Sequence, residues 1–248
     1  RTIIVEITAE ISIEDLIAQE DMVVTVTRSG YIKRNPITLY SSQHRGGKGK
    51  TAMGTKSDDF VEHFFVASTH ATFLFITNFG KVYQSKVYEL PMAGRSSLGK
   101  AIVNLLNFDE GEKLATVLTV DEFVENKYVV MATKKGRVKK TDLMAYSRRR
   151  SGGLIGVKLA EGDELIVARI TDGNMNIFLG SEGGKVIRFH EGDVRATARG
   201  SMGVRGMRID QNVKVVGMEV LGPEDTLLTV TENGYGKRSS IEDYRTQT

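Results

Sequence analysis

Five segments of the chain share one pattern of hydrophobic and polar residues. Each begins with a run of β-branched and aromatic residues, continues through a short polar turn that ends in glycine, and closes with a basic stretch. Because glycine adopts the positive φ that tight hairpin turns need, each segment is predicted to form a β-hairpin. The five segments cover residues 23–34, 73–83, 128–140, 177–188 and 227–238.

The turn glycines recur at nearly regular intervals. They are spaced by 50, 56, 48 and 50 residues, which is hard to produce by chance, and they are Gly30, Gly80, Gly136, Gly184 and Gly234. Hairpin repeats of this length favour four-stranded sheets arranged radially, which leaves only short, protected edges. We therefore predict an all-β, propeller-like fold of four-stranded blades. The alternative is a β-sandwich with coincidental turn glycines; a WD40 propeller is disfavoured because the chain has no tryptophan.

The repeats also predict the organisation of the chain. Its 248 residues are enough for one or two domains. The repeat units, near residues 22–57, 73–107, 128–160, 177–210 and 227–248, predict a single domain over residues 1–248. The fifth unit stops where its loop should begin, so we expect this domain to be truncated at its C-terminus. A brief helical turn is expected near residues 12–18.

A second periodic element follows the hairpins. An arginine lies 15 residues after the turn glycine in the first, second and fourth units, and two arginines lie 13 and 14 residues after it in the third. Each lies in a short loop rich in glycine or serine. We therefore expect an equivalent position on each blade to carry a basic loop, with the arginines Arg45, Arg95, Arg149, Arg150 and Arg199.

Charge follows the same period, although the net charge is only +3. Residues 22–57 hold seven basic side chains and no carboxylate, and residues 134–158 hold nine against one. The connecting stretches 1–21 and 109–127 hold six carboxylates each. Lysine and arginine neutralise phosphates and release counterions, so a basic rim would bind duplex DNA without reading its sequence.

Composition argues against several other functions. The absence of cysteine excludes a disulfide framework, thiolate catalysis and the common zinc ribbons, and the four histidines have no metal-ligand spacing. The glycine-rich loop at residues 45–49 does not have the Walker A spacing. No apolar run is long enough to span a bilayer, so we expect no membrane partner. Without cysteines the compartment is not constrained by redox, and we take the cytoplasm as the default location. We find no catalytic residue and no metal site in the sequence.

One loop and several hairpin motifs resemble a known family. Gln43-His44-Arg45-Gly46-Gly47-Lys48-Gly49 resembles the GyrA box, the Gln-Arg-Arg-Gly-Gly-Lys-Gly heptad of DNA gyrase A C-terminal domains. The Gly-Tyr-Ile-Lys-Arg and Gly-Tyr-Gly-Lys-Arg hairpins, Val87-Tyr88-Glu89-Leu90-Pro91 and Gly203-Val204-Arg205-Gly206 are similar to the same family, so the resemblance covers essentially the whole chain. The chain departs from the heptad at His44, which carries one fewer permanent charge at pH 7 than arginine.

This resemblance implies a six-bladed β-pinwheel, of which five hairpins are visible, that binds, bends and wraps DNA around its rim. The wrap enables gyrase, a type II topoisomerase, to introduce negative supercoils. The resemblance implies that the DNA-binding residues are the box itself (Gln43, His44, Arg45, Gly46, Gly47, Lys48 and Gly49) and a rim. The rim residues are Lys33, Arg34, Lys50, Arg95, Lys100, Lys139, Lys140, Arg148, Arg149, Arg150, Arg188, Arg199, Arg205, Lys237 and Arg238.

The resemblance also implies partners and a location. The partners are double-stranded DNA, the rest of the gyrase A subunit, and the gyrase B subunit in an A2B2 holoenzyme at the nucleoid. No cofactor is expected in this domain, because ATP and Mg²⁺ act in other domains and subunits, and the DNA-cleaving tyrosine lies upstream. Two alternatives stay open: the pinwheel of the topoisomerase IV A-type subunit, and a propeller scaffold that binds acidic proteins. The intact Arg-Gly-Gly-Lys-Gly favours gyrase.

Overall fold

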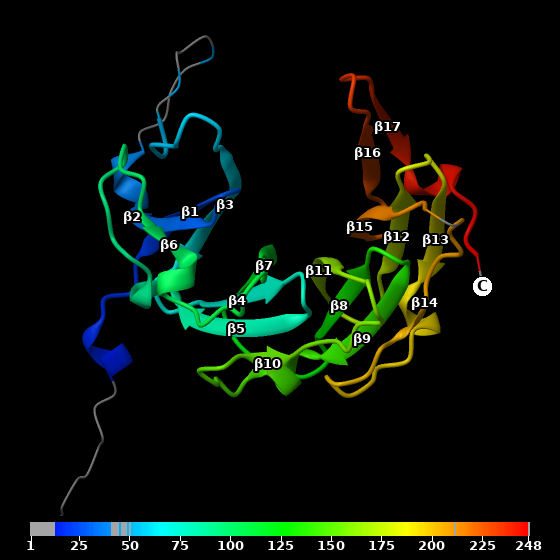
Figure 1. The fold of residues 1–248 in the computed structure, drawn as a ribbon, viewed down its shortest axis with the longest axis horizontal. Helices are drawn as coiled ribbons and strands as arrows, with labels where there is room; N and C mark the ends of the chain where they lie inside the picture. The colour runs from blue at the N-terminus through cyan, green and yellow to red at the C-terminus, as the bar shows by residue number, and fades with distance from the viewer. Residues whose placement is uncertain (1–12, 41–44, 46–48, 50, 211, 248) are drawn as a thin grey trace, which may run out of the picture. The chain divides into compact units, whose positions relative to one another are not determined.

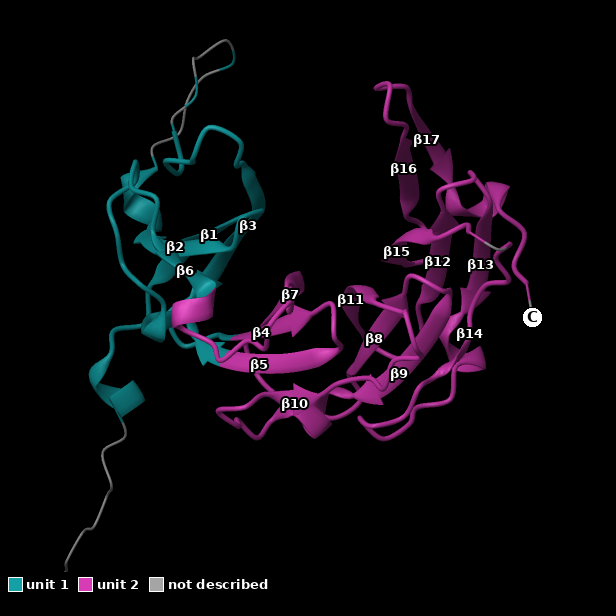
Figure 2. Cartoon of the chain, viewed as in Figure 1, with its two compact units in different colours: residues 1–72, 85–102 teal, residues 73–84, 103–248 magenta. Residues whose placement is uncertain are grey.

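The computed structural model describes residues 13–40, 45, 49, 51–210 and 212–247 (Figure 1). The regular structure in these residues consists of β-strands and short 3₁₀ turns, one of which, η1 (Ile13–Leu16), lies where the sequence predicts a helical turn. The chain divides into two compact units, residues 1–72 with 85–102 and residues 73–84 with 103–248 (Figure 2). That residues 1–248 form a single domain stays a prediction.

The first unit contains one complete four-stranded antiparallel sheet. Its strand order is β3-β1-β2-β6. The strands are β1 (Asp21–Thr27), β2 (Tyr31–Pro36), β3 (Val61–Ser68) and β6 (Lys100–Ala101). Strand β1 is central and its last six residues are all buried, because it is covered on both faces and paired on both edges.

Two further four-stranded sheets belong largely to the second unit. The order of the second sheet is β10-β5-β4-β7 and that of the third is β11-β8-β9-β14. The second contains β4 (Thr72–Thr77), β5 (Lys81–Lys86), β7 (Leu114–Val120) and β10 (Leu154–Ile155). The third contains β8 (Tyr128–Thr133), β9 (Arg137–Asp142), β11 (Leu165–Thr171) and β14 (Val204–Arg205).

The last two sheets have fewer strands than the four that the sequence predicts for each blade. The fourth has the order β13-β12-β15, and the fifth is the hairpin β16-β17. Their strands are β12 (Asn176–Ser181), β13 (Val186–His190), β15 (Val215–Leu221), β16 (Thr226–Val230) and β17 (Gly236–Ser240). Strand β16 pairs only with β17 among the described residues, and Leu228 and Val230 on it are each 64% exposed.

The predicted hairpins are confirmed, one in each sheet. All five turn glycines have positive φ, between 74° and 81°. The hairpins of Gly30 and Gly184 lie in separate sheets, as a blade for each repeat requires. A 3₁₀ turn follows each hairpin: η2 (Ile37–Leu39), η3 (Val87–Glu89), η5 (Leu143–Tyr146), η6 (Glu191–Asp193) and η7 (Ile241–Asp243); a further turn, η4 (Ile102–Asn104), follows β6.

Each complete sheet takes its fourth strand from a later repeat. Strand β6 follows the second hairpin in sequence but pairs with β2 of the first sheet, where Ala101 opposes Tyr31. In the same way β10 pairs with β5, and β14 pairs with β9. Three of the segments that carry predicted basic loops, those with Arg95, Arg149 and Arg199, therefore end as the edge strand of the preceding sheet. This exchange holds the loop against that sheet rather than its own.

The hydrophobic core is built from the inner strands of each sheet. In the second unit, buried side chains of β4, β5, β8 and β11 form one cluster, including Leu74, Ile76, Val82 and Met131. A second cluster joins β8 and β9 to the fourth sheet, around Val130, Leu179 and Met218. Burying such a side chain contributes ~1.5–3 kcal/mol, so these clusters provide a rigid base for the loops at the sheet edges.

A candidate nucleic-acid interface

Three basic loops lie directly before the exchanged strands. They span residues 94–99, 148–153 and 198–203, and each contains a tight turn closed by a main-chain hydrogen bond. The donors and acceptors are Ser97 N to Gly94 O (3.1 Å), Gly153 N to Arg150 O (3.1 Å) and Ser201 N to Ala198 O (3.2 Å). The period of the arginines in the sequence therefore placed these loops correctly, one beside each of three sheets.

The arginines of these loops are accessible. Arg148, Arg149 and Arg150 are exposed, and Arg95 and Arg199 are half-buried. Arg205 and Lys100, on the exchanged strands themselves, are exposed. Within the described part of the chain no carboxylate forms an ion pair with Arg95, Arg148, Arg150, Arg199 or Arg205. These guanidinium groups can accept an external anion without first losing a partner.

The lysines near the hairpin turns are in the opposite situation. Lys81 pairs with Asp109, Lys134 with Glu164 at 3.4 Å, and Lys185 with Asp210 at 2.9 Å. The carboxylates come from the acidic connectors or from the stretch that precedes the next outer strand. These carboxylates therefore neutralise charge near the hairpin turns and leave the loop arginines uncompensated.

The structure corrects the predicted rim at three lysines. Lys33, Lys139 and Lys140 are only 0%, 1% and 6% exposed, so they do not present their charge to solvent as a rim residue would. Their place on the second strand of a hairpin was misleading, because the exchanged segment covers a strand edge that would otherwise be open.

The two lysines at the third position after a turn glycine hold the basic loops. The ammonium group of Lys33 donates hydrogen bonds to the carbonyls of Gly94, at 2.9 Å, and of Arg95. That of Lys139 donates to Thr141 Oγ1 and to the carbonyls of Gly156 and Arg199, each at 2.7 Å. Burial lowers the pKa of Lys33; burial, with a smaller contribution from Arg199, lowers the pKa of Lys139 to about 8.

The basic residues at the fourth position after a turn glycine hold the 3₁₀ turn of the next repeat. Arg34 donates to the carbonyls of Tyr88 (3.0 Å) and Leu90 (2.8 Å). Arg188 donates to the carbonyls of Ile241 and Tyr244, at 2.7 and 3.1 Å. Lys140 reaches Glu191, whose carboxylate lies 3.0 Å from its ammonium group. These three side chains therefore form hydrogen bonds or an ion pair inside the protein. No pattern in the sequence indicated these contacts.

Most of the box-like heptad lies outside the described residues, namely Gln43, His44, Gly46, Gly47 and Lys48. The predicted rim residue Lys50 also lies outside them. The two described members, Arg45 and Gly49, are exposed, and Gly49 has a φ of 70°.

The position of Gly49 recurs in two of the other loops. Gly99 and Gly203 also lie 19 residues after a turn glycine and have φ values of 83° and 72°. A Cβ atom would come within 2.5 Å of the Ile32 carbonyl oxygen at Gly99 and within 2.3 Å of the Val138 carbonyl oxygen at Gly203. This glycine lets the loop return to the sheet edge. The spacing of 19 residues from the turn glycine is therefore a second sequence signal for these loops. The hairpin and arginine patterns do not include it.

Comparison with known proteins decides the family. A family model described as "DNA gyrase C-terminal domain, beta-propeller" matches residues 21–68, 71–121, 127–172, 176–221 and 225–248, one match for each hairpin repeat. The chain belongs to this family. Membership confirms the resemblance drawn from the heptad and the hairpin motifs, and it confirms the predicted all-β, propeller-like fold class.

Relatives and solved structures agree with this membership. The DNA gyrase A subunit of Salmonella typhimurium is 47% identical over 247 residues, which cover 100% of this chain and 28% of that protein. A crystal structure of the C-terminal domain of DNA topoisomerase IV has a TM-score of 0.78 at 27% identity, covering 94% of this chain and 71% of that one. A structure of the DNA gyrase A C-terminal domain has a TM-score of 0.74 at 27% identity, covering 92% of this chain and 74% of that one.

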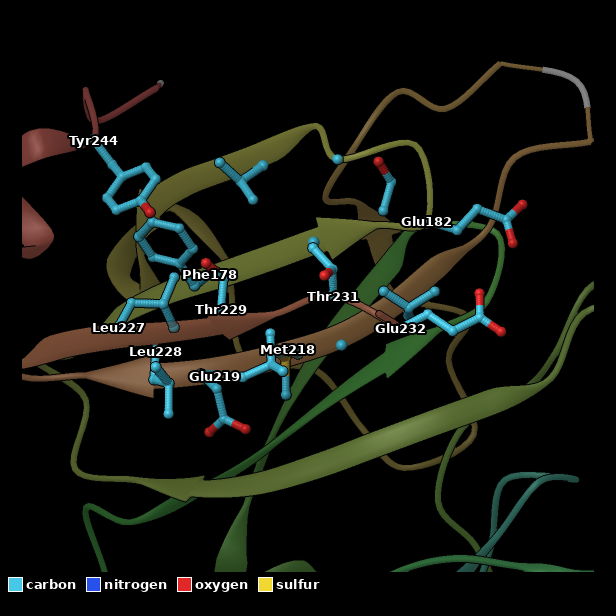
Figure 3. A pocket seen from close by; sticks show the side chains of 17 residues that line it. Phe178, Glu182, Met218, Glu219, Leu227, Leu228, Thr229, Thr231, Glu232 and Tyr244 are labelled. Atoms are coloured by element: carbon cyan, nitrogen blue, oxygen red, sulfur yellow. The ribbon is translucent and has the colours of Figure 1, made fainter. Parts of the chain in front are cut away.

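The fifth repeat of this gyrase-family chain differs from the others. Its predicted rim residues Lys237 and Arg238 are exposed on β17, because this hairpin has no further strand beside it among the described residues. Strands β12, β15 and β16 border a groove of about 750 Å³ (Figure 3). The groove is lined by apolar side chains together with Glu182, Glu219 and Glu232, and these carboxylates disfavour a phosphate there.

Two other kinds of site are missing from the part of the chain that the structure describes. It contains no group of three histidine, aspartate or glutamate side chains that could hold a metal ion. It also contains no helix long and apolar enough to cross a membrane.

Proposed function

We propose that this chain binds, bends and wraps duplex DNA without sequence preference, as part of a DNA gyrase A subunit. The observation that supports this most strongly is the repeated loop arginine without an ion-pair partner among the described residues, found beside three successive sheets. One such arginine could be an accident of the surface. An arginine without an ion-pair partner on each of several equivalent loops provides phosphate contacts spread along a bent duplex.

Spread contacts are what wrapping requires. Bending a 20–30 bp site by 40–90° costs on the order of 1–6 kcal/mol, so a long wrap stays favourable only if new phosphate contacts form along its length. The contact set that we propose is Arg95, Lys100, Arg148, Arg149, Arg150, Arg199, Arg205, Lys237 and Arg238, with the heptad 43–49 and Lys50. Lys33, Lys139 and Lys140 are left out because they are buried. Arg34 and Arg188 are left out because their guanidinium groups bind internal carbonyls.

The wider setting is part of the same proposal. The chain spans 28% of the length of the Salmonella typhimurium relative. In a gyrase, this domain would act with the remainder of the A subunit, as well as the B subunit, in an A2B2 holoenzyme at the nucleoid in the cytoplasm. Strand cleavage and the use of ATP and Mg²⁺ would belong to those other parts. Negative supercoiling would follow from the handedness of the wrapped segment.

A length series at fixed salt tests the proposal. The protein in its natural full length is bound to duplexes of increasing length, and nicked plasmid is closed by ligase in its presence. Wrapping predicts that affinity keeps rising with length and that the closed plasmid retains a shifted linking number. A plateau at the shortest duplexes with no shift in linking number would contradict it.

Salt dependence separates wrapping from the binding of acidic proteins. If six to ten phosphates are contacted, affinity should fall roughly 10³–10⁵-fold between 50 and 200 mM salt. A propeller scaffold for acidic proteins would show no dependence on duplex length.

A topoisomerase IV subunit is the second candidate because the fold similarity is equally high, but the 47% identity is to a gyrase protein.

A further inference from the structure

The buried lysines fix the direction of several peptide groups in two basic loops. In the first unit, Lys33 has no exposed surface, and its ammonium group binds the carbonyl oxygens of Gly94 and Arg95. In the second unit, the ammonium group of Lys139 binds the carbonyl oxygen of Arg199 in the same manner. These three carbonyl groups therefore point inward, towards the strand that carries the lysine.

Inward carbonyls turn the adjoining amides outward. In a trans peptide the N–H of one residue points opposite to the carbonyl of the residue before it. The amides of Arg95, Ser96 and Gly200 must then point away from their sheets. None of these three N–H groups donates a hydrogen bond to another described residue, and Ser96 and Gly200 are exposed.

The outward amides lie on the same turns as the unpaired arginines. Arg95 occupies the second position of the turn that Ser97 N closes onto Gly94 O, and Arg199 occupies the same position of the turn that Ser201 N closes onto Ala198 O. The successive outward N–H groups of Arg95 and Ser96 can form an anion-binding concavity, whereas the second turn offers the single outward N–H of Gly200. Hydrogen bonds from main-chain donors to a charged acceptor are stronger than those between neutral groups.

We propose that the turns at residues 94–97 and 198–201 each bind a DNA backbone phosphate through outward main-chain N–H groups, two in the first turn and that of Gly200 in the second. Lys33 and Lys139 are the positioning residues that hold these N–H groups outward. The inference rests on the proposed function, since it names how two loops hold the duplex. The second sheet has Tyr83 in place of the lysine, and its hydroxyl bonds to Asn107 and Glu112. No lysine therefore holds its loop at 148–153, where Gln84 Nε2 donates instead to the carbonyl of Arg148 at 3.4 Å.

Two substitutions at Arg95 separate the amide from the side chain. Arg95→Ala removes the guanidinium and keeps the N–H, whereas Arg95→Pro removes both. Proline is favoured at the second position of such a turn, and the preceding residue is Gly94, so the backbone can accept it. We expect Arg95→Pro to weaken duplex binding by a further three- to tenfold, roughly, beyond Arg95→Ala, measured with the protein in its natural full length and a fluorescent duplex.

A second pair of variants tests the positioning lysine. Lys33→Met keeps the length of the side chain but cannot hold the two carbonyls. We expect roughly three- to tenfold weaker binding with an unchanged slope of affinity against salt, because this ammonium group touches no phosphate. Lys185→Met, which removes a surface lysine near a hairpin turn, is the matched control and should leave affinity within about twofold. Circular dichroism establishes that each variant is folded.

The outcomes distinguish this inference from the proposed function. Equal affinities of Arg95→Pro and Arg95→Ala, with the unsubstituted protein binding duplex normally, would overturn the amide contact alone. A Lys33→Met protein that binds like the unsubstituted one would overturn the positioning role. If Lys33→Met does not fold, the Arg95 pair decides the inference by itself. Failure of the unsubstituted protein to bind duplex would instead overturn the proposed function.

Discussion

Two sets of basic side chains recur along this chain, and they differ in whether a carboxylate pairs with them. Lysines near the hairpin turns, such as Lys134 and Lys185, are held in ion pairs with Glu164 and Asp210. The loop arginines Arg95, Arg148, Arg150 and Arg199 have no such partner among the described residues, although they occur in the same repeats. Charge density in the sequence is therefore a poor guide to where an anion can bind; what matters is whether a carboxylate is already in place.

The difference has a simple physical origin. A paired surface lysine must give up its carboxylate before it can bind a phosphate, so its net gain is small. An unpaired arginine on an exposed loop gains the full release of counterions from the DNA. Substitutions in the loops and at the turns should therefore have different effects on DNA binding.

The largest effect is expected from removing three loop arginines together. Arg95→Ala, Arg148→Ala and Arg199→Ala should reduce the slope of log affinity against log salt by about 2.7, at roughly 0.9 for each phosphate contact. The matched turn variant, Lys81→Met with Lys134→Met and Lys185→Met, should change the slope by less than about 1. Titrations at several salt concentrations measure both. Equal losses in the two variants would remove the distinction between loop and turn.

The next effect concerns the heptad. Replacing Arg45 and Lys48 by alanine should abolish most of the linking-number shift while weakening the binding of a short duplex by only about tenfold, because bending needs every contact along the path. Ligase closure of nicked plasmid in the presence of the full-length protein measures the first quantity. If the variant still constrains writhe as the unsubstituted protein does, the heptad is only another basic loop.

Alanine substitutions at a loop glycine and at a turn glycine should lower the free energy of unfolding by different amounts. Gly203 and Gly184 both have positive φ, but a Cβ atom would clash with the Val138 carbonyl oxygen only at Gly203. Gly184→Ala should cost about 1 kcal/mol from backbone strain, and Gly203→Ala about 2–4 kcal/mol, since strand and loop must also separate. Denaturant unfolding gives both values. A cost at Gly203 no greater than that at Gly184 would argue against the close approach of loop and sheet.

The smallest effect is a pH dependence at Lys139. Its pKa is about 8 in the folded chain and close to the ordinary value of 10.5 when unfolded, so between these values the unfolded chain binds more protons and stability rises with pH. We expect Lys139→Met to remove roughly 1–2 kcal/mol of this rise, relative to the unsubstituted protein, whereas Lys134→Met should not. Unfolding measured at about pH 7.5 and about pH 10 in each protein gives the difference. If the Lys139→Met and unsubstituted proteins have identical pH profiles of stability, burial of the Lys139 ammonium group does not destabilise the folded chain.

The sequence by itself determined the repeating units of this protein. Hairpins form at residues 23–34 and in the four equivalent segments because β-branched runs flank a glycine that adopts positive φ, and these are local requirements. The period of the glycines and arginines likewise placed a basic loop in successive repeats, and the heptad pointed to the family. Each hairpin, loop and heptad depends on residues that lie close together in the sequence, and the period only repeats these local units.

Only the tertiary structure decided which basic side chains are accessible to an external anion. Strand β6 belongs by sequence to the second repeat but completes the first sheet, and the loop before it covers Lys33. Pairing Lys185 with Asp210, or Lys139 with the Arg199 carbonyl, joins positions 25 and 60 residues apart. Such contacts depend on how strands are exchanged between sheets, which no local pattern of hydrophobic and charged residues encodes, because burial of a charge is set by what packs over it.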